Sequence, residues 1–140
     1  MKQIPVIFWT GTGNTQMMAD AIAEAINAAG AEAVVKNVSE ITADEAAGYD
    51  ALALGCPAMG AEVLEECEFE PFFTELEGKL AGKKVALFGS YGWGGTYMQD
   101  WEARVKDAGA TLVADGVLAL GAPDDEEMAK LAEAGKLLAE

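Results

Sequence analysis

The chain has 140 residues, 51% of them hydrophobic, and nine basic against 24 acidic side chains give it a formal net charge of -15 at pH 7. This length supports one hydrophobic core, so we expect a single domain over residues 1–140. The negative charge disfavours binding to nucleic acids and anionic membranes. The absence of histidine argues against most hydrolases and transition-metal sites, because histidine is the usual proton shuttle and the commonest metal ligand.

The sequence also bears on the compartment. No stretch approaches the roughly 18 consecutive apolar residues of a membrane-spanning helix, and the first residues lack the pattern of a secretory signal. Cys56 and Cys67 are too far apart for a C-x-x-C pair, and two thiols cannot form the disulfide framework of a secreted protein, so we expect both to be reduced. We therefore expect a cytoplasmic protein.

Short apolar stretches alternate with longer segments of helical periodicity. The stretches predicted as strands are residues 4–8, 33–38, 51–54, 85–88 and 111–117. The segments predicted as helices are residues 15–29, 42–47, 69–80, 98–108 and 126–139, and three of them are followed by the stop signals Gly30, Gly82 and Gly109. The alternation predicts a doubly wound α/β fold with a parallel sheet and a ligand site beyond the carboxyl ends of its strands.

Pro5 is at odds with this arrangement. It falls inside the first predicted strand, and the topology makes that strand central. A proline cannot donate to the ladder of a central strand. We therefore predict that Pro5 lies at the entry of the strand.

Residues 10–15, with the sequence TGTGNT, join the first predicted strand to a helix. Free N–H groups and the positive end of the helix dipole bind an anion at such a position. No lysine or arginine occurs between Gln3 and Val35, and both the lysine of a Walker loop and the third glycine of a dinucleotide fingerprint are missing. An uncharged loop suits one phosphate monoester. The alternative is an ordinary glycine turn capped by Thr10 or Thr12.

Two further loops are predicted to reach the same edge, residues 55–62 (GCPAMGAE) and 89–95 (GSYGWGG). The glycines around Trp93 allow close backbone approach and present a large aromatic ring to a flat ligand. The alternative is that Trp93 packs into a groove beside a neighbouring tyrosine. Met59 alone indicates a core residue, but opposite Trp93 it can contact the same ligand.

These segments resemble the short-chain flavodoxins of anaerobic bacteria. The resemblance extends over nearly the whole chain and rests on residues 10–15, 55–60, 62–66, 68–72 and 87–94. It implies a flavodoxin-like fold, a five-stranded parallel sheet of order 2-1-3-4-5, and non-covalently bound FMN. It also implies a low-potential carrier of single electrons between oxidoreductases, with no catalytic or metal-binding residues of its own.

The resemblance assigns the phosphate to the hydroxyls and amides of residues 10–15, with a contribution from Ser90. It assigns ring stacking to Trp93 and Met59, a hydrogen bond from N3–H to Glu62, and contacts to the pyrimidine oxygen to amides around Gly92. The peptide after Gly60 turns its carbonyl toward the proton gained at N5. The cofactor-binding residues predicted in this way are Thr10, Gly11, Thr12, Gly13, Asn14, Thr15, Pro57, Ala58, Met59, Gly60, Glu62, Ser90, Tyr91, Gly92, Trp93 and Gly94.

Two positions depart from the family pattern. Ala61 replaces the aspartate, asparagine, serine or glycine that is common there, which predicts shifted potentials with the function retained. Residues 120–122, Leu-Gly-Ala, stand where some relatives carry polar side chains near the ribityl chain or the ring. The ribityl contacts are therefore left open.

Acidic residues gather in two stretches. Residues 62–77 contain seven glutamates and no basic residue, and residues 124–127 are four further acids. One interpretation is solvated helix faces and favourable charge at helix N-termini. The other is that the charge steers basic patches of redox partners, such as ferredoxin-type oxidoreductases, and lowers the potential by repelling added negative charge on the flavin. We expect such a mobile carrier to be a monomer.

The sequence argues against most alternatives to an electron carrier. A small FMN-dependent reductase would need a substrate pocket, for which 140 residues leave little room. A receiver domain needs acids at residues 9–10 and 55–56, where this chain has Trp-Thr and Gly-Cys. A low-molecular-weight phosphatase needs an arginine six residues after a cysteine, where this chain has Glu62 and Phe73. A flavin-free interaction protein stays open.

Overall fold

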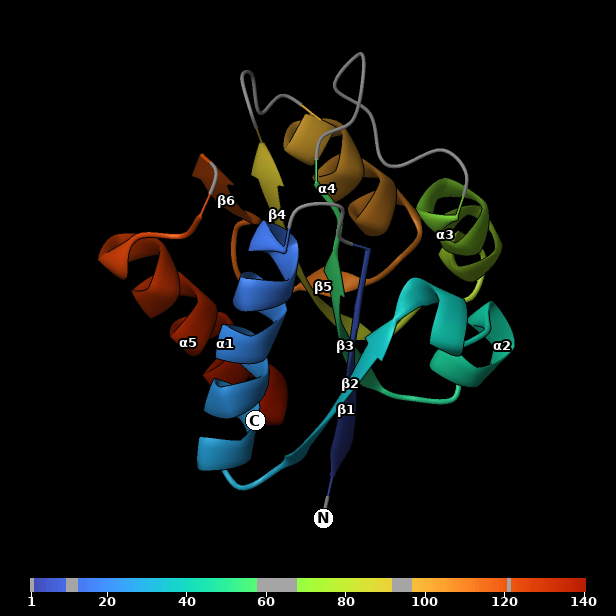
Figure 1. Ribbon diagram of the computed structural model, residues 1–140. Helices are drawn as coiled ribbons and strands as arrows, with labels where there is room; N and C mark the ends of the chain where they lie inside the picture. The colour runs from blue at the N-terminus through green and yellow to red at the C-terminus, as the bar shows by residue number, and fades with distance from the viewer. Residues whose placement is uncertain (1, 10–12, 58–67, 92–96, 121) are drawn as a thin grey trace.

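A computed structural model describes residues 2–9, 13–57, 68–91, 97–120 and 122–140. In these segments one sheet contains the strands β1 (Gln3–Phe8), β2 (Glu32–Asn37), β3 (Ala51–Gly55), β4 (Lys84–Tyr91), β5 (Thr111–Leu112) and β6 (Val117–Leu120). All pairings are parallel, the order is β2-β1-β3-β4-β5, and β6 also pairs with β4 (Figure 1). The predicted doubly wound sheet of order 2-1-3-4-5 is confirmed.

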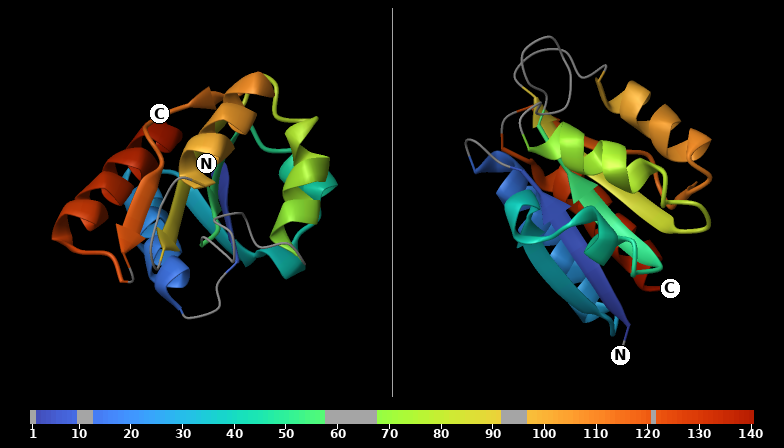
Figure 2. Two further views of the ribbon diagram at one scale, coloured as in Figure 1. Left: turned by 90° about the horizontal axis from the view of Figure 1, so that it is seen from above. Right: turned by 90° about the vertical axis from the view of Figure 1, so that its right-hand side faces the viewer.

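Helices cover both faces of the sheet. They are α1 (Asn14–Ala28), η1 (Val38–Glu40), α2 (Ala43–Ala46), α3 (Phe69–Glu77), α4 (Tyr97–Asp107) and α5 (Asp125–Ala139). One core layer joins α1 and α5 to side chains such as Val6 and Phe8, and the other joins α2, α3 and α4 to side chains such as Ile7 and Leu54 (Figures 1 and 2). Successive side chains of a strand point to opposite faces, which is why neighbours on β1 enter different layers.

The last predicted strand is two strands. β5 pairs with Lys84 and Val85 at the start of β4, and β6 pairs with Phe88–Tyr91 at its end. Between them, the Gly116 amide donates to the Glu102 carboxylate on α4 (2.7 Å). The expectation of one continuous strand over residues 111–117 was therefore wrong, because a long-range side-chain contact draws the chain away from the ladder.

Pro5 is the third residue of β1, so the prediction that it begins the strand was wrong. The Trp9 amide donates to the Gly55 carbonyl of β3 (3.0 Å), and alternation along the strand points the Pro5 nitrogen to the same side. β1 pairs with β2 from Gln3 onward, but its pairing with β3 begins only at Val6. The missing N–H is accommodated before the ladder to β3 begins.

The predicted helix ends agree with the structure to within a few residues, and the stop signals Gly30, Gly82 and Gly109 all adopt positive φ. The short η1 helix was not predicted, although its signal is present. The Asn37 side chain accepts from the Ser39 amide, and the Glu40 side chain accepts from the Asn37 amide. This reciprocal cap is a known start signal for a helix.

Candidate functional site

The carboxyl ends of β1, β3 and β4 point to the same edge of the sheet, the upper edge in Figure 1. Phe8 is aligned with Gly55, and Gly55 with Phe88, so β1 and β3 end at one level, while β4 continues to Tyr91 beside β6. The described residues at this edge include Trp9, residues 13–15 and residues 56–57. This is the edge at which ligands bind in open parallel sheets.

The start of α1 is built to receive an acceptor from outside the helix. Its N-cap is Gly13, with φ 93° and ψ -10°, a left-handed conformation that strains residues with a side chain. Glycine offers no side chain to cap the amides of the first turn, and that turn contains no acidic residue. The N–H groups and the dipole therefore favour an anion there.

Two hydroxyl groups meet beside this helix start. The side-chain oxygens of Thr15, in the first turn of α1, and Ser90, near the end of β4, lie 3.2 Å apart, and either can donate. Both side chains are buried, 1% and 6% exposed. A hydroxyl has one donor and two lone pairs, so this single contact leaves capacity for a further ligand.

The end of β3 is held by α4. The Tyr97 hydroxyl donates to the Cys56 carbonyl (2.8 Å) in a buried contact, and the Cys56 amide donates to the Phe88 carbonyl (3.1 Å). Burial, and secondarily the electrostatic effect of Cys56, raises the pKa of the Tyr97 hydroxyl well above its usual range, so it remains a donor. Gly89 packs against this contact, because a Cβ there would overlap the Cys56 carbonyl and the Tyr97 hydroxyl.

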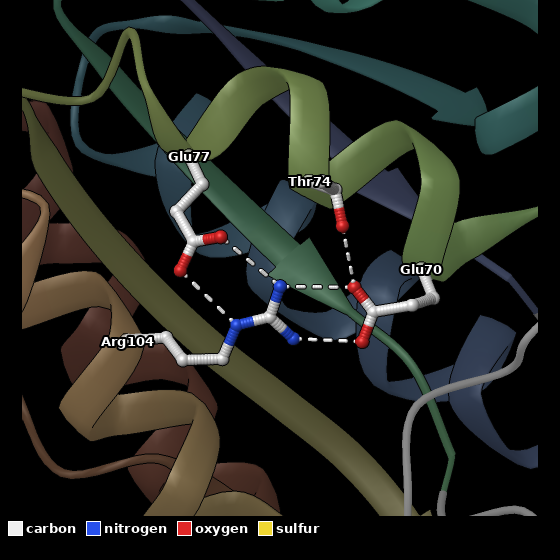
Figure 3. A network of polar contacts seen from close by, with 4 residues as sticks. All are labelled: Glu70, Thr74, Glu77 and Arg104. Atoms are coloured by element: carbon white, nitrogen blue, oxygen red, sulfur yellow. Dashed lines mark hydrogen bonds and ion pairs between the residues drawn. The ribbon is translucent and has the colours of Figure 1, made fainter.

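Away from this edge, several acidic side chains form hydrogen bonds and ion pairs within the protein. Glu70 and Glu77 on α3 both bind Arg104 on α4, and Thr74 donates to Glu70 (Figure 3). Hydrogen bonding to Arg104 holds the pKa of the Glu70 carboxyl below its usual value. At the start of α5, Asp124 and Glu127 form a capping box. The interpretation as favourable charge at helix N-termini is confirmed for Glu70, Asp124 and Glu127, whereas the ion pairs of Glu70 and Glu77 with Arg104 were not predicted.

The structure describes six of the predicted cofactor-binding residues, namely Gly13, Asn14, Thr15, Pro57, Ser90 and Tyr91, all of them at the edge described above. It brings the side chains of Thr15 and Ser90 into contact. The others, Thr10, Gly11, Thr12, Ala58, Met59, Gly60, Glu62, Gly92, Trp93 and Gly94, lie outside the described residues, as do Ala61 and Cys67. The contacts of Tyr97 and Gly89 with Cys56 carry no local signal and were not predicted from the sequence.

Comparison with known proteins decides the family. The family model described as Flavodoxin matches residues 6–135. The flavodoxin of Clostridium beijerinckii is 49% identical over 87% of this chain and 89% of its own, and that of Megasphaera elsdenii is 47% identical over 82% and 85%. The solution structure of two-electron reduced Megasphaera elsdenii flavodoxin superposes with a TM-score of 0.87, covering 95% of this chain and 98% of that one, at 45% identity. The chain belongs to the flavodoxin family.

Flavodoxins bind FMN and carry electrons, so this flavodoxin is an FMN-binding electron carrier rather than an enzyme. The predicted family, fold, cofactor and function are confirmed. The same evidence excludes the receiver, phosphatase and flavin-free alternatives. Among the residues that the structure describes, no helix combines the length and the apolar character needed to cross a membrane.

Proposed function

We propose that this flavodoxin holds the FMN phosphate at the start of α1. The hydroxyls of Thr10, Thr12 and Thr15, the Asn14 side chain and the amides of residues 11 and 13 would form the phosphate site, with Ser90 completing it. The observation that carries this proposal is the combination of a left-handed glycine N-cap with the buried Thr15–Ser90 hydroxyl pair. Uncharged donors at a helix start, with no carboxylate in the first turn, fit a phosphate monoester.

The ring would occupy the same edge between two loops. We assign stacking to Trp93 and Met59, the N3–H contact to Glu62, and the carbonyl that meets N5 to the peptide after Gly60. The remaining wall would come from Pro57, Ala58, Tyr91, Gly92 and Gly94. The support for these roles is the resemblance to flavodoxins, together with the end of β3 and the end of β4 at the same edge of the sheet.

Bound FMN supplies the electron chemistry, and the protein's own contribution is electrostatic and geometric. A net charge of -15, with no basic residue between Gln3 and Val35, disfavours further negative charge at this edge. We infer that this charge makes the protein a low-potential carrier of single electrons. The same charge suits partner oxidoreductases with basic docking patches.

We further propose that residues 1–140 act as one cytoplasmic domain and as a monomer. The outer edge of β2 supports the monomeric state. The Ala33 amide donates to the Asn27 side chain (2.8 Å), and the Asn37 amide donates to Glu40 (2.7 Å). Both amides face away from β1, because alternate residues of β2 pair with it. Side chains therefore occupy donors that another strand would need.

The phosphate assignment is tested by comparing FMN with riboflavin, which lacks the phosphate. Protein loaded with either flavin is diluted, and the released flavin is measured by its fluorescence. We expect the wild type to bind FMN at least 100-fold more tightly than riboflavin, since about 2.7 kcal/mol is a modest sum for several phosphate hydrogen bonds.

The variant Thr15→Val removes one hydroxyl and should reduce that preference roughly tenfold, as expected for one hydrogen bond to a charged group. Thr74→Val on α3 is the control, because its hydroxyl donates to Glu70. Equal affinities for the two flavins in the wild type would exclude a phosphate site of this kind.

A further inference from the structure

The chain between β3 and α3 is held at both described ends by side chains from other elements. At one end the Tyr97 hydroxyl of α4 donates to the Cys56 carbonyl (2.8 Å). At the other, the Trp9 indole N–H, just after β1, donates to the Glu68 carboxylate (3.2 Å). The residues between these ends include Met59, Gly60 and Glu62, to which the proposed function assigns three contacts with the ring.

The Tyr97 anchor is rigid for three reasons. Its side chain is 3% exposed, and its ring stacks on Trp101 with centroids 6.5 Å apart and planes at 25°. Burial keeps the hydroxyl protonated, so it donates over the whole working pH range. Gly89 leaves no room for a side chain beside the hydroxyl and the carbonyl, so β4 closes the contact from the other side.

The Cys56 carbonyl needs such an anchor because the ladder ends there. The Cys56 amide still donates to the Phe88 carbonyl of β4, but β3 itself ends at Gly55. Gly60 is four residues further along the chain. The proposed function requires the carbonyl of the peptide after Gly60 to lie within hydrogen-bond distance of the flavin N5. Pro57 follows Cys56 directly, and its fixed φ of about −65° passes the direction set at Cys56 on to the next residues of the chain.

We propose that Tyr97 is a positioning residue for the flavin ring. Its hydroxyl fixes the Cys56 carbonyl and with it the start of the chain that carries Met59, Gly60 and Glu62, while Trp9 fixes the far end through Glu68. This inference rests on the proposed function, because it acts through the ring contacts assigned there. It concerns the ring and leaves the phosphate site at α1 untouched.

Tyr97→Phe tests the proposal, because it deletes only the hydroxyl and keeps the ring on Trp101. Loss of one partner of a buried hydrogen bond should weaken both FMN and riboflavin binding, each roughly five- to tenfold, and leave the ratio of the two affinities unchanged. The separation between the two one-electron potentials should also narrow. It falls by about 59 mV for each tenfold decrease in the equilibrium constant with which the oxidised and two-electron-reduced flavin form the one-electron-reduced flavin. Tyr49→Phe is the matched control, since Tyr49 lies near the opposite edge of the sheet, before the start of β3.

The measurements distinguish failure of this inference from failure of the proposed function. A Tyr97→Phe protein with a lower melting temperature but unchanged flavin affinities and potentials would overturn the inference and leave a structural role. A change in the ratio of FMN to riboflavin affinity would also overturn it, because the hydroxyl would then act on the phosphate. Failure of the wild type to bind either flavin would instead refute the proposed function.

Trp9→Phe provides an independent arm, because the Trp9–Glu68 hydrogen bond is exposed and phenylalanine keeps an aromatic ring against the core cluster on which Trp9 packs. It should narrow the separation of the potentials in the same direction as Tyr97→Phe, and by less. Unchanged potentials in this variant would remove Trp9 from the proposal. The remaining claim would then concern Tyr97 alone.

Discussion

Replacing Arg104 by methionine should measure how strongly α4 holds α3. The guanidinium binds both oxygens of Glu70 (2.7 and 2.9 Å) and both oxygens of Glu77 (3.1 Å each), and it lies 4.7 Å from the centroid of the Phe73 ring (Figure 3). The three charged side chains are about one third exposed, at 30%, 35% and 31%. Methionine keeps the apolar stem and removes only the charged fork.

The expected loss follows from these contacts. Partly exposed ion pairs are worth about 0.2–1 kcal/mol each, near the upper value when the geometry is bidentate, and the cation–π contact adds about 0.5–1 kcal/mol. The sum is about 2.5 kcal/mol, or a fall of about 9 °C in melting temperature for a domain of this size. Arg104→Lys keeps the charge but not the fork, so it should restore less than half of the loss.

The dependence on pH has a definite sign. Because hydrogen bonding to Arg104 lowers the pKa of Glu70 in the folded state, this stabilisation is fully present above the unfolded value of about 4.3 and is lost as pH falls through the folded value. The difference between wild type and Arg104→Met should therefore be complete at pH 7 and shrink below about pH 4.

The assay is thermal unfolding at one fixed excess of FMN, because bound ligand adds to the measured stability. Lys130→Met is the control, since its pair with Glu126 spans 3.7 Å with both side chains mostly exposed, and it should cost less than about 0.5 kcal/mol. A deficit below about 2 °C at pH 7, or one that persists undiminished at pH 3, would refute the reasoning.

Two further predictions concern the start of α1 and the outer edge of β2. Gly13→Ala should cost about 1 kcal/mol of stability through its left-handed backbone and weaken FMN more than riboflavin, measured by thermal unfolding and flavin release; equal losses for the two flavins would contradict a role at the phosphate. The double variant Asn27→Ala, Glu40→Ala should free two outward amides of β2 and raise the apparent mass in sedimentation at high concentration, whereas a monomer at every concentration would show that these side chains are not needed to block the edge.

The order of strands and helices could be predicted from the sequence because it depends on local periodicity. Apolar stretches of strand length and helical faces repeat in alternation, and glycines mark the ends of three helices. The break between β5 and β6 could not be predicted, since it depends on a hydrogen bond between Glu102 and Gly116. The position of Pro5 depends on the offset between two strand pairings, which one sequence does not reveal.

The candidate site divides in the same way. Its loops could be proposed from the sequence because glycines, threonines and an aromatic residue flanked by glycines are local signals of anion and ring binding. Its supports were not, since Tyr97 is 41 residues from Cys56 and Trp9 is 59 residues from Glu68. Contacts between residues so far apart in the sequence leave no periodic or spacing signal.

Three polar contacts between distant elements lie where the ladders of the sheet end. Thr15 with Ser90, Tyr97 with Cys56, and Trp9 with Glu68 join α1 to β4, α4 to β3, and β1 to α3. Within the sheet, backbone hydrogen bonds fix the chain, but beyond the strand ends the chain needs other partners. A carrier whose cofactor supplies the chemistry depends on a site held in place by its supporting residues. Substitutions at these contacts should therefore alter flavin binding more than stability, and substitutions in the apolar layers should do the reverse.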